Sequence, residues 1–212
     1  MEDLALELHR LFNEQRRFSF PFDNVINDIP YNGVYIIFEN GETFKGFDRI
    51  VRIGAHTGNN QLRSRLHQHY LNENKNRSIL RKNIGRCFLN RENNPYLHLW
   101  ELDTTSRVDK TNNLKLLDLI FEKQLEKKIS NYIQTNFSFC VFRVDLKEER
   151  LFWESRIIST LTLSKDIRPS ENWLGNHSPK EKIKASGLWQ VNGLFKESLS
   201  EMEFEQLKKL VP

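Results

Sequence analysis

Gly33-Val34-Tyr35-Ile36-Ile37-Phe38 is the stretch from which the rest of the chain can be interpreted. This apolar run of β-branched and aromatic residues follows the turn-forming Pro30-Tyr31-Asn32, which is typical of a buried strand. A second run, Ile50-Val51-Arg52-Ile53-Gly54, is shorter and stops at a glycine. The two runs predict an antiparallel hairpin, joined by a loop over residues 39–49 that is longer than a tight turn needs.

An amphipathic helix is expected after the hairpin, because Leu62, Leu66 and Tyr70 recur at helical spacing. Arg65 and His69 are four residues apart, so their side chains lie on one face, at the margin of the apolar stripe. A cation and a histidine held together at the edge of a core suit the binding of a phosphate.

A third strand and a further helix follow much later in the chain. Residues 137–145 are apolar nearly throughout, as a central strand requires, and residues 147–161 have helical periodicity. On that helix Glu154 falls inside the apolar arc. A buried carboxylate normally has a cation or a metal as its partner, because an isolated one is costly or shifts its pKa. From the residues alone, a salt bridge, for example to Arg65, is the commoner explanation.

These elements resemble the GIY-YIG nucleases, which include restriction enzymes, phage homing endonucleases and the incision nuclease of nucleotide excision repair. Gly33-Val34-Tyr35 matches the first motif and Arg52-Ile53-Gly54 the second, with arginine in place of tyrosine and more residues than usual between the motifs. The family has an arginine on the next helix, a glutamate on a later helix and often an asparagine after it. Arg65, Glu154 and Asn172 correspond to these, although Asn172 lies further past the glutamate than usual.

The resemblance implies an α+β fold, in which a small three-stranded antiparallel sheet is flanked by helices. We expect a single domain. Its core would be residues 30–86 and 136–176, with a helical insertion at about 87–135 and a C-terminal extension at 177–212.

Local patterns predict elements outside this core. They indicate an N-terminal helix over residues 1–13, a strand at 96–102 and a long helix at 114–133. Ser78 can begin a short helix that Gly85 ends. Ser178 with Glu181, and Ser200 with Glu203, predict capping boxes for two helices, of which the first ends before Gly187 and the second near Leu210.

As an expectation from the resemblance, the protein hydrolyses phosphodiester bonds with one divalent cation, Mg²⁺ or another such as Mn²⁺. Glu154 would hold the metal, because a lone carboxylate with phosphate oxygens and waters suits Mg²⁺. Tyr35 would accept or relay a proton from the attacking water, with Arg52 lowering its pKa. Arg65 would neutralise charge on the scissile phosphate, and His69 would assist on the nucleophile side.

A second set of polar and basic residues is expected to bind DNA. The basic members lie on or after the arginine helix, where a solvated face is roughly as common as contact with the DNA backbone. The asparagines lie in a loop, where such residues more often bond to the backbone. The set is His56, Arg63, Arg77, Arg81, Lys82, Arg86, Asn172 and Asn176.

Composition limits the possible partners and cellular location of the protein. A net charge of +4 and a pI near 9.0 over 212 residues permit a polyanionic partner without requiring one. Cys87 and Cys140 have no Cys-x-x-Cys spacing and are expected to be buried, reduced thiols. No run approaches the roughly 18 apolar residues of a membrane span, so we expect a cytoplasmic protein without membrane contact.

Three functions remain open on the sequence. We favour a restriction-type endonuclease that cuts double-stranded DNA, with a DNA-repair or homing-type nuclease as the alternative among nucleases, since no zinc finger or helix-turn-helix suggests a modular homing enzyme. A homodimer would suit cleavage of both strands at a symmetric site. The alternatives are a binding module that keeps the fold without chemistry, which the missing second tyrosine favours, and an unrelated basic α/β protein.

Overall fold

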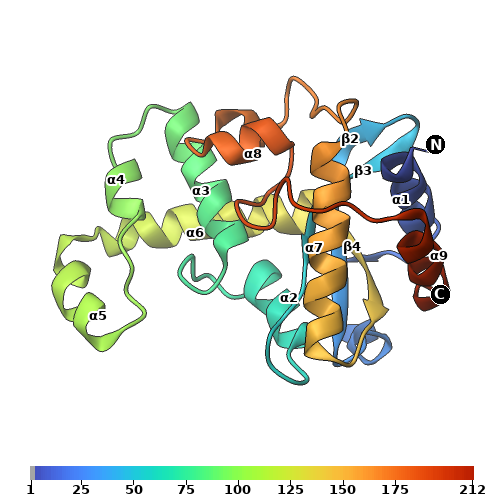
Figure 1. Ribbon diagram of the computed structural model, residues 1–212. Coiled ribbons are helices and arrows are strands. Elements are labelled where there is room, and N and C mark those ends of the chain that lie inside the picture. Colours follow the sequence, from blue (N-terminus) through green and yellow to red (C-terminus); the bar gives the residue numbers. More distant parts are fainter. Residues whose placement is uncertain (1–2) are drawn as a thin grey trace.

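Three apolar runs of the chain form the core strands of one antiparallel sheet in the computed structural model, which describes residues 3–212 (Figure 1). The central strand β2, Gly33–Phe44, pairs on one side with β3, Phe47–Gly54, and on the other with β4, Phe137–Arg143. A two-residue strand, β1 (Phe18–Ser19), extends the sheet at β4 and gives the order β1-β4-β2-β3. The predicted α+β class and its three core strands are confirmed, and β1 is an addition.

The β2–β3 hairpin is longer than the apolar runs indicate. The predicted loop over residues 39–49 is wrong, because both strands continue to a tight turn at Lys45 and Gly46. These turn residues have φ of 48° and 89°, and positive φ at both positions suits a two-residue hairpin turn. Irregular pairing between Phe38 and Thr43 accommodates the extra length.

Distant partners explain why a polar stretch can continue β2 as a strand. The buried carboxylate of Glu39 accepts hydrogen bonds from the indole nitrogens of Trp173 and Trp189, each at 2.8 Å. Glu42 forms a buried ion pair with Arg49 on β3. Neither partnership is visible in the local pattern, in which Glu39 to Glu42 has the composition of a turn.

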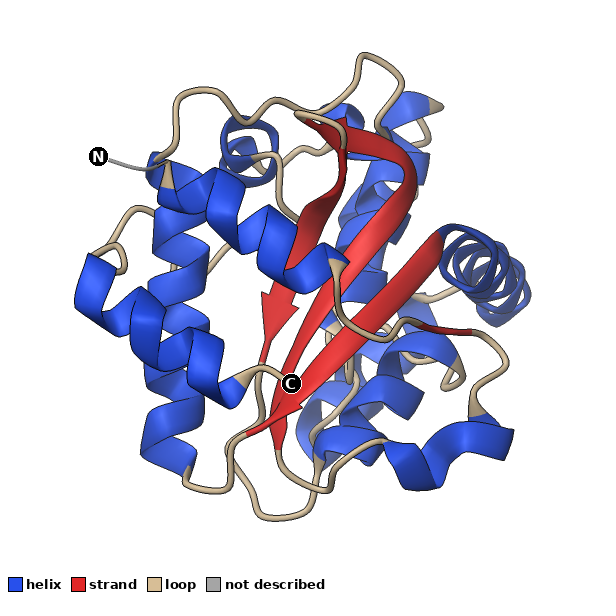
Figure 2. Ribbon diagram, turned by 90° about the vertical axis from the view of Figure 1, so that its right-hand side faces the viewer, coloured by secondary structure: helices blue, strands red, loops and turns tan. Residues whose placement is uncertain are grey.

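Helices cover both faces of the sheet (Figure 2). One face packs against α1 (Leu4–Asn13), α7 (Lys147–Leu163) and α9 (Glu201–Leu210), and the other against α2 (Leu62–Tyr70), α3 (Ile79–Arg91) and α6 (Leu119–Asn136). Because successive strand residues point to opposite faces, β2 supplies Val34 and Ile36 to the first core and Tyr35 and Ile37 to the second. The expected N-terminal helix is present from Leu4, while Met1 and Glu2 lie outside the described residues.

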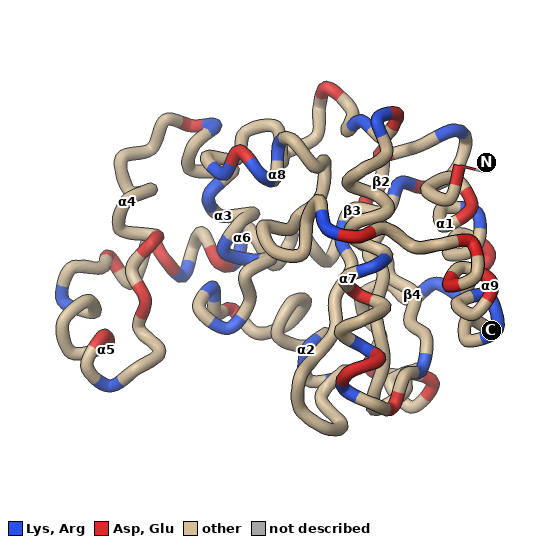
Figure 3. The backbone as a smooth tube through the Cα atoms, viewed as in Figure 1, with Lys and Arg blue, Asp and Glu red and all other residues tan. Residues whose placement is uncertain are grey.

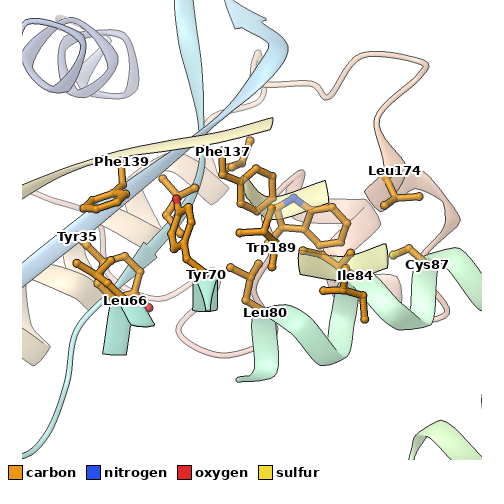
Figure 4. Packing of buried hydrophobic residues seen from close by; sticks show 14 of the residues in the cluster. Tyr35, Leu66, Tyr70, Leu80, Ile84, Cys87, Phe137, Phe139, Leu174 and Trp189 are labelled. Atoms are coloured by element: carbon orange, nitrogen blue, oxygen red, sulfur yellow. The ribbon is translucent and has the colours of Figure 1, made fainter. Parts of the chain in front are cut away.

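The second core includes residues from the C-terminal part of the chain. Trp189 lies in the middle of this cluster, beside Phe137 and Leu80 (Figure 4). Cys87 belongs to the same cluster, and both it and Cys140 are buried and free, as expected.

The region between β3 and β4 differs from its prediction in two places. The strand expected at residues 96–102 is wrong, because this stretch forms the short helix α4, Leu97–Trp100. The expected end of α3 at Gly85 is also wrong, because α3 continues to Arg91. One contact explains both: the Trp100 ring packs on Gly85, where an added Cβ would lie 2.5 Å from it. Gly85 therefore allows close approach and does not end the helix.

Beyond α4, the chain forms α5, Arg107–Asn113, and the 3-10 turn η2, Leu114–Leu116, before α6 begins at Leu119. The predicted long helix at 114–133 is thus present but begins later. In Figure 1, α4 and α5 project from the sheet at the end of α6.

The C-terminal region contains the 3-10 turn η3 (Leu174–His177), α8 (Glu181–Ser186) and α9. The capping box expected at Ser178 is wrong, because its hydroxyl accepts from the Lys180 amide and α8 has no side-chain cap. Gly187 ends α8 with φ of 66°, as predicted, and Ser200 and Glu203 form the predicted box on α9. Among residues 3–212, no helix is long and apolar enough to cross a membrane.

Candidate active site

A cavity of about 410 Å³ lies at the outer edge of the sheet, between β3, α7 and the C-terminal segment. It brings together Arg52 from β3, Arg65 from α2 and Glu154 from α7, three of the residues predicted to be catalytic. These residues are far apart in the chain, so the fold alone makes them neighbours.

Glu154 contributes the carboxylate of this cavity. Its Oε1 accepts a hydrogen bond from the Ala55 amide at 3.1 Å, just beyond the end of β3. Burial raises the pKa of the Glu154 carboxyl above its usual value, while Arg52, the Ala55 amide and Arg65 act in the opposite direction. Within residues 3–212 no ion pair joins Glu154 to a cation, so the salt bridge to Arg65 is not formed. The carboxylate remains available to a ligand in the cavity.

Arg52 is nearly fully buried, with 5% of its surface exposed. One guanidinium nitrogen donates to the carbonyl of Trp189. Its Nε has no hydrogen-bond partner among the described residues. A buried, unsatisfied donor is unfavourable unless a ligand accepts from it, and a phosphate oxygen is a suitable acceptor.

Arg65 is held only by neutral groups. Its Nη1 donates to the Gln68 side chain and to the Arg77 carbonyl, each at 2.9 Å. Its positive charge is therefore not neutralised by a carboxylate within the described chain. With Arg52, it gives the cavity an excess of positive charge over the single carboxylate of Glu154.

Tyr35 and His69 form a buried pair beside these arginines. The Tyr35 hydroxyl lies 2.8 Å from Nε2 of His69. Neither residue is among those lining the cavity, yet Arg52 and Arg65 are near enough to act on the imidazole. Burial holds the pKa of His69 well below its usual value, and the positive charges of the arginines lower it further. His69 is therefore neutral.

The glycine of the second motif has a steric role at this pair. A Cβ on Gly54 would lie 2.2 Å from both the ring carbon and the hydroxyl oxygen at the tip of Tyr35. Any side chain at this position would therefore displace the tyrosine hydroxyl. The two motifs are thus fitted to each other across the β2–β3 pair, in which Tyr35 stands opposite Gly54.

Ser78 contacts the second ring nitrogen of His69. The fully buried Ser78 hydroxyl accepts from the Arg81 amide at 3.3 Å and lies 2.7 Å from Nδ1 of His69. Since a buried hydroxyl hydrogen needs an acceptor, we assign it to Nδ1, which leaves the imidazole hydrogen on Nε2. With this assignment His69 donates a hydrogen bond to the Tyr35 oxygen.

Two of the residues predicted to bind DNA, His56 and Arg63, lie outside the cavity. His56 is buried, and its two ring nitrogens bond to the Gly33 amide and the Gly58 carbonyl. Arg63 donates to the Ile29 carbonyl at 2.8 Å and covers the ring of Tyr31 at 4.0 Å. Neither His56 nor Arg63 lines the cavity.

The basic residues of α3 are used within the protein. Arg81, fully buried, forms an ion pair with Glu126 at 2.6 Å. Arg86 is buried and pairs with Glu101, whose carbonyl accepts from Lys82. The expected exposed cluster is therefore wrong for Arg81 and Arg86, because α6 and the α4 region bring carboxylates to them. Basic and acidic residues accordingly intermix around α3 and α6 (Figure 3); Arg77, in contrast, is exposed.

The two predicted asparagines also lie outside the cavity. Asn172 is exposed, and Asn176 donates to the carbonyls of Ser170 and Glu171. The structure places Gln190, Asn192 and Lys196 on the cavity wall instead. No local pattern identifies these three, because they lie in an irregular segment that reaches the site only through the tertiary fold.

Comparison with known proteins agrees with this geometry. A family model described as the GIY-YIG domain matches residues 4–212. No curated protein and no solved structure matches the chain. Proteins with this domain are generally endonucleases that act on DNA, typically with divalent metal ions. Residues 3–212 contain no group of three or more His, Cys, Asp or Glu that could hold a metal ion.

Proposed function

Because this chain belongs to the GIY-YIG family, we propose that it is a metal-dependent endonuclease that hydrolyses phosphodiester bonds in double-stranded DNA. One observation carries the proposal: within residues 3–212, Glu154 forms no ion pair, and it shares a cavity with two arginines that form none with any carboxylate. A phosphodiester would balance the excess positive charge of the two arginines, and the free carboxylate of Glu154 would be available to a divalent cation.

The arginines suit the phosphate. Arg65 would neutralise charge that develops on the phosphoryl oxygens in the transition state. Arg52 would donate its unsatisfied Nε–H to the same group, because a guanidinium forms strong, charge-assisted bonds to phosphate. Their pre-set positions, held by carbonyl groups and by Gln68, avoid reorganisation during the reaction.

A divalent cation fits the donor set of this cavity, with Glu154 as its protein ligand. Mg²⁺ is commonly bound by one or two carboxylates together with substrate phosphates and waters, so a lone glutamate is sufficient once DNA is present. When bound, such a cation polarises a phosphoryl oxygen and lowers the pKa of a bound water. Mn²⁺, which prefers similar ligands, is expected to substitute for it.

Tyr35 would serve as the proton acceptor on the nucleophile side. Its hydroxyl oxygen is held at 2.8 Å from Nε2 of His69, so the tyrosine has a fixed position for exchanging a proton. Arginine in place of the second motif tyrosine then contributes a fixed charge, so the replacement is compatible with chemistry.

Within the nucleases, we favour a restriction-type enzyme. The supporting observation is that α4 and α5 project from the sheet at the end of α6, where surface for sequence recognition would be useful (Figure 1). The exposed residues Arg77 and Asn172 remain candidates for DNA contact. Two copies of the chain would allow both strands of a symmetric site to be cut.

The proposal is tested by incubating the protein with plasmid and phage DNA in MgCl₂ and in EDTA. Wild type should give discrete fragments only with the metal, and Glu154→Ala should give none. Glu148→Ala is the matched control, because Glu148 is an exposed glutamate in the first turn of the same helix. DNA binding without cleavage by wild type would favour the non-catalytic module, and equal cleavage by Glu154→Ala would refute the assigned site.

A further inference from the structure

The segment after α8 lies along the outer edge of the sheet. The Trp189 amide donates to the Val51 carbonyl at 2.8 Å, and the Gln190 side chain accepts from the Ile53 amide at 3.0 Å. These bonds satisfy backbone groups that β3 would otherwise expose as an edge strand. The Trp189 carbonyl also holds Arg52. The C-terminal extension is therefore in direct contact with a residue of the candidate active site.

The same segment is fastened to α7, the helix that carries Glu154. Three hydroxyl side chains of α7 form hydrogen bonds with the backbone of residues 193–199. These are Ser159 with Gly193 and Lys196, Thr162 with Phe195, and Thr160 with Leu199, at distances between 2.8 and 3.2 Å. The backbone position of Lys196 relative to Glu154 is consequently fixed by helix α7.

Lys196 presents an unneutralised charge to the cavity. Lys196 is exposed and lines the cavity together with Arg52, Arg65 and Glu154. No carboxylate within residues 3–212 forms an ion pair with it, and the neighbouring Glu197 is bound to Arg156 at 2.6 Å. Three cations therefore face one carboxylate, an imbalance that a polyanionic strand would correct.

We propose that the segment 189–196 forms one wall of the active site and that Lys196 binds a backbone phosphate of the DNA strand. This inference rests on the proposed nuclease function. An ammonium group on a flexible stem suits a single phosphate oxygen as a point charge, whereas the arginines can make planar contacts. Lys196 is thus a substrate-binding residue supplied from outside the motifs.

Binding should be measured separately from cleavage. Fluorescence anisotropy of a mixed-sequence duplex, with Glu154→Gln as the non-cleaving background, gives the dissociation constant over a series of salt concentrations. Adding Lys196→Ala should weaken binding about tenfold at low salt, as expected for loss of a charged hydrogen bond. It should also lower the slope of log K against log salt by about 0.9, the value for one lost phosphate contact.

Lys209→Ala is the matched control, because Lys209 is an exposed lysine on α9 without an ion pair in the described chain. It should leave the affinity and the salt slope unchanged, and Lys196→Arg should retain most of the binding. Circular dichroism would confirm that the variants are folded.

The outcomes separate this inference from the proposed function. If wild type cleaves DNA and Lys196→Ala behaves as Lys209→Ala does, the role of Lys196 is refuted while the nuclease stands. If Lys196→Ala alone loses affinity and salt slope, the wall is established, even where wild type binds without cleaving. If wild type neither binds nor cleaves DNA, both proposals fall.

Discussion

Arg65 and Arg81 lie on consecutive helices, yet the protein uses them in opposite ways. Arg81 is fully buried, pairs with Glu126 and also donates to the His69 carbonyl at 3.0 Å. Among the described residues Arg65 has only neutral acceptors, and it lines the cavity. The difference predicts that Arg81 stabilises the fold, whereas Arg65, which no described carboxylate neutralises, binds substrate.

Among the variants that test this contrast, Arg81→Ala is expected to lose the most unfolding free energy. It leaves the Glu126 carboxylate buried without its cation, and breaking such a pair costs about 3–5 kcal/mol of unfolding free energy. Urea unfolding followed by circular dichroism measures this loss. The double variant Arg81→Met/Glu126→Leu should lose less than Arg81→Ala alone, since it removes both charges; an equal or larger loss would contradict the ion-pair explanation.

Arg65→Ala should show the converse behaviour. The folded protein loses only hydrogen bonds to neutral groups, so its stability should change little. Cleavage should slow by about 10²–10³-fold, the usual effect of removing one group that stabilises transition-state charge. Single-turnover cleavage rates and urea unfolding should be compared in the same preparation. Destabilisation as large as that of Arg81→Ala would remove the contrast between the two arginines.

Ser78→Ala should lose less stability than Arg81→Ala and more than Arg65→Ala. Ser78 both caps α3 and contacts His69 of the candidate site. Loss of its cap on α3 should cost about 1 kcal/mol of stability. Loss of its bond to His69 should also shift the pH–rate profile, since Nδ1 no longer has a fixed donor. Ser78→Thr keeps the hydroxyl and should restore the profile. A stability loss with an unchanged profile would limit Ser78 to capping.

The smallest change in stability is expected from Glu154→Gln. Burial raises the pKa of Glu154, so ionisation of this carboxyl opposes folding. The cost is fully present above the raised pKa and disappears below the unfolded value of about 4.3. Glu154→Gln should therefore be slightly more stable than wild type at neutral pH, and the gain should vanish in acid. Urea unfolding at several pH values measures it; a gain that grows in acid would contradict the raised pKa.

Much of the site could be predicted from the sequence because its residues lie in locally recognisable elements. Tyr35 and Arg52 lie in apolar runs that form strands, and Arg65, His69 and Glu154 lie on periodic helices that resemble family motifs. The order of those elements brings three of the five predicted catalytic residues to one cavity and pairs Tyr35 with His69.

The parts of the fold and site that could not be predicted depend on contacts between distant residues, which leave no local sequence pattern. Arg81 and Glu126 are 45 residues apart, and Arg52 and the Trp189 carbonyl are 137 apart. Periodicity describes which face of an element is apolar, but it does not indicate which distant carboxylate neutralises a given arginine. For the same reason Lys196, in an irregular segment, could not be identified before its neighbours were known.

The contact between Arg52 and the Trp189 carbonyl has a consequence for the timing of protein synthesis. The β2–β3 hairpin is made early, whereas the carbonyl that orients Arg52 belongs to a residue added 137 positions later. A nascent chain that has emerged only as far as α7 carries Tyr35, Arg65 and Glu154 but has no wall at 189–196. Under the proposed function, a ribosome-bound fragment of this kind is expected to cleave DNA less well than the finished chain.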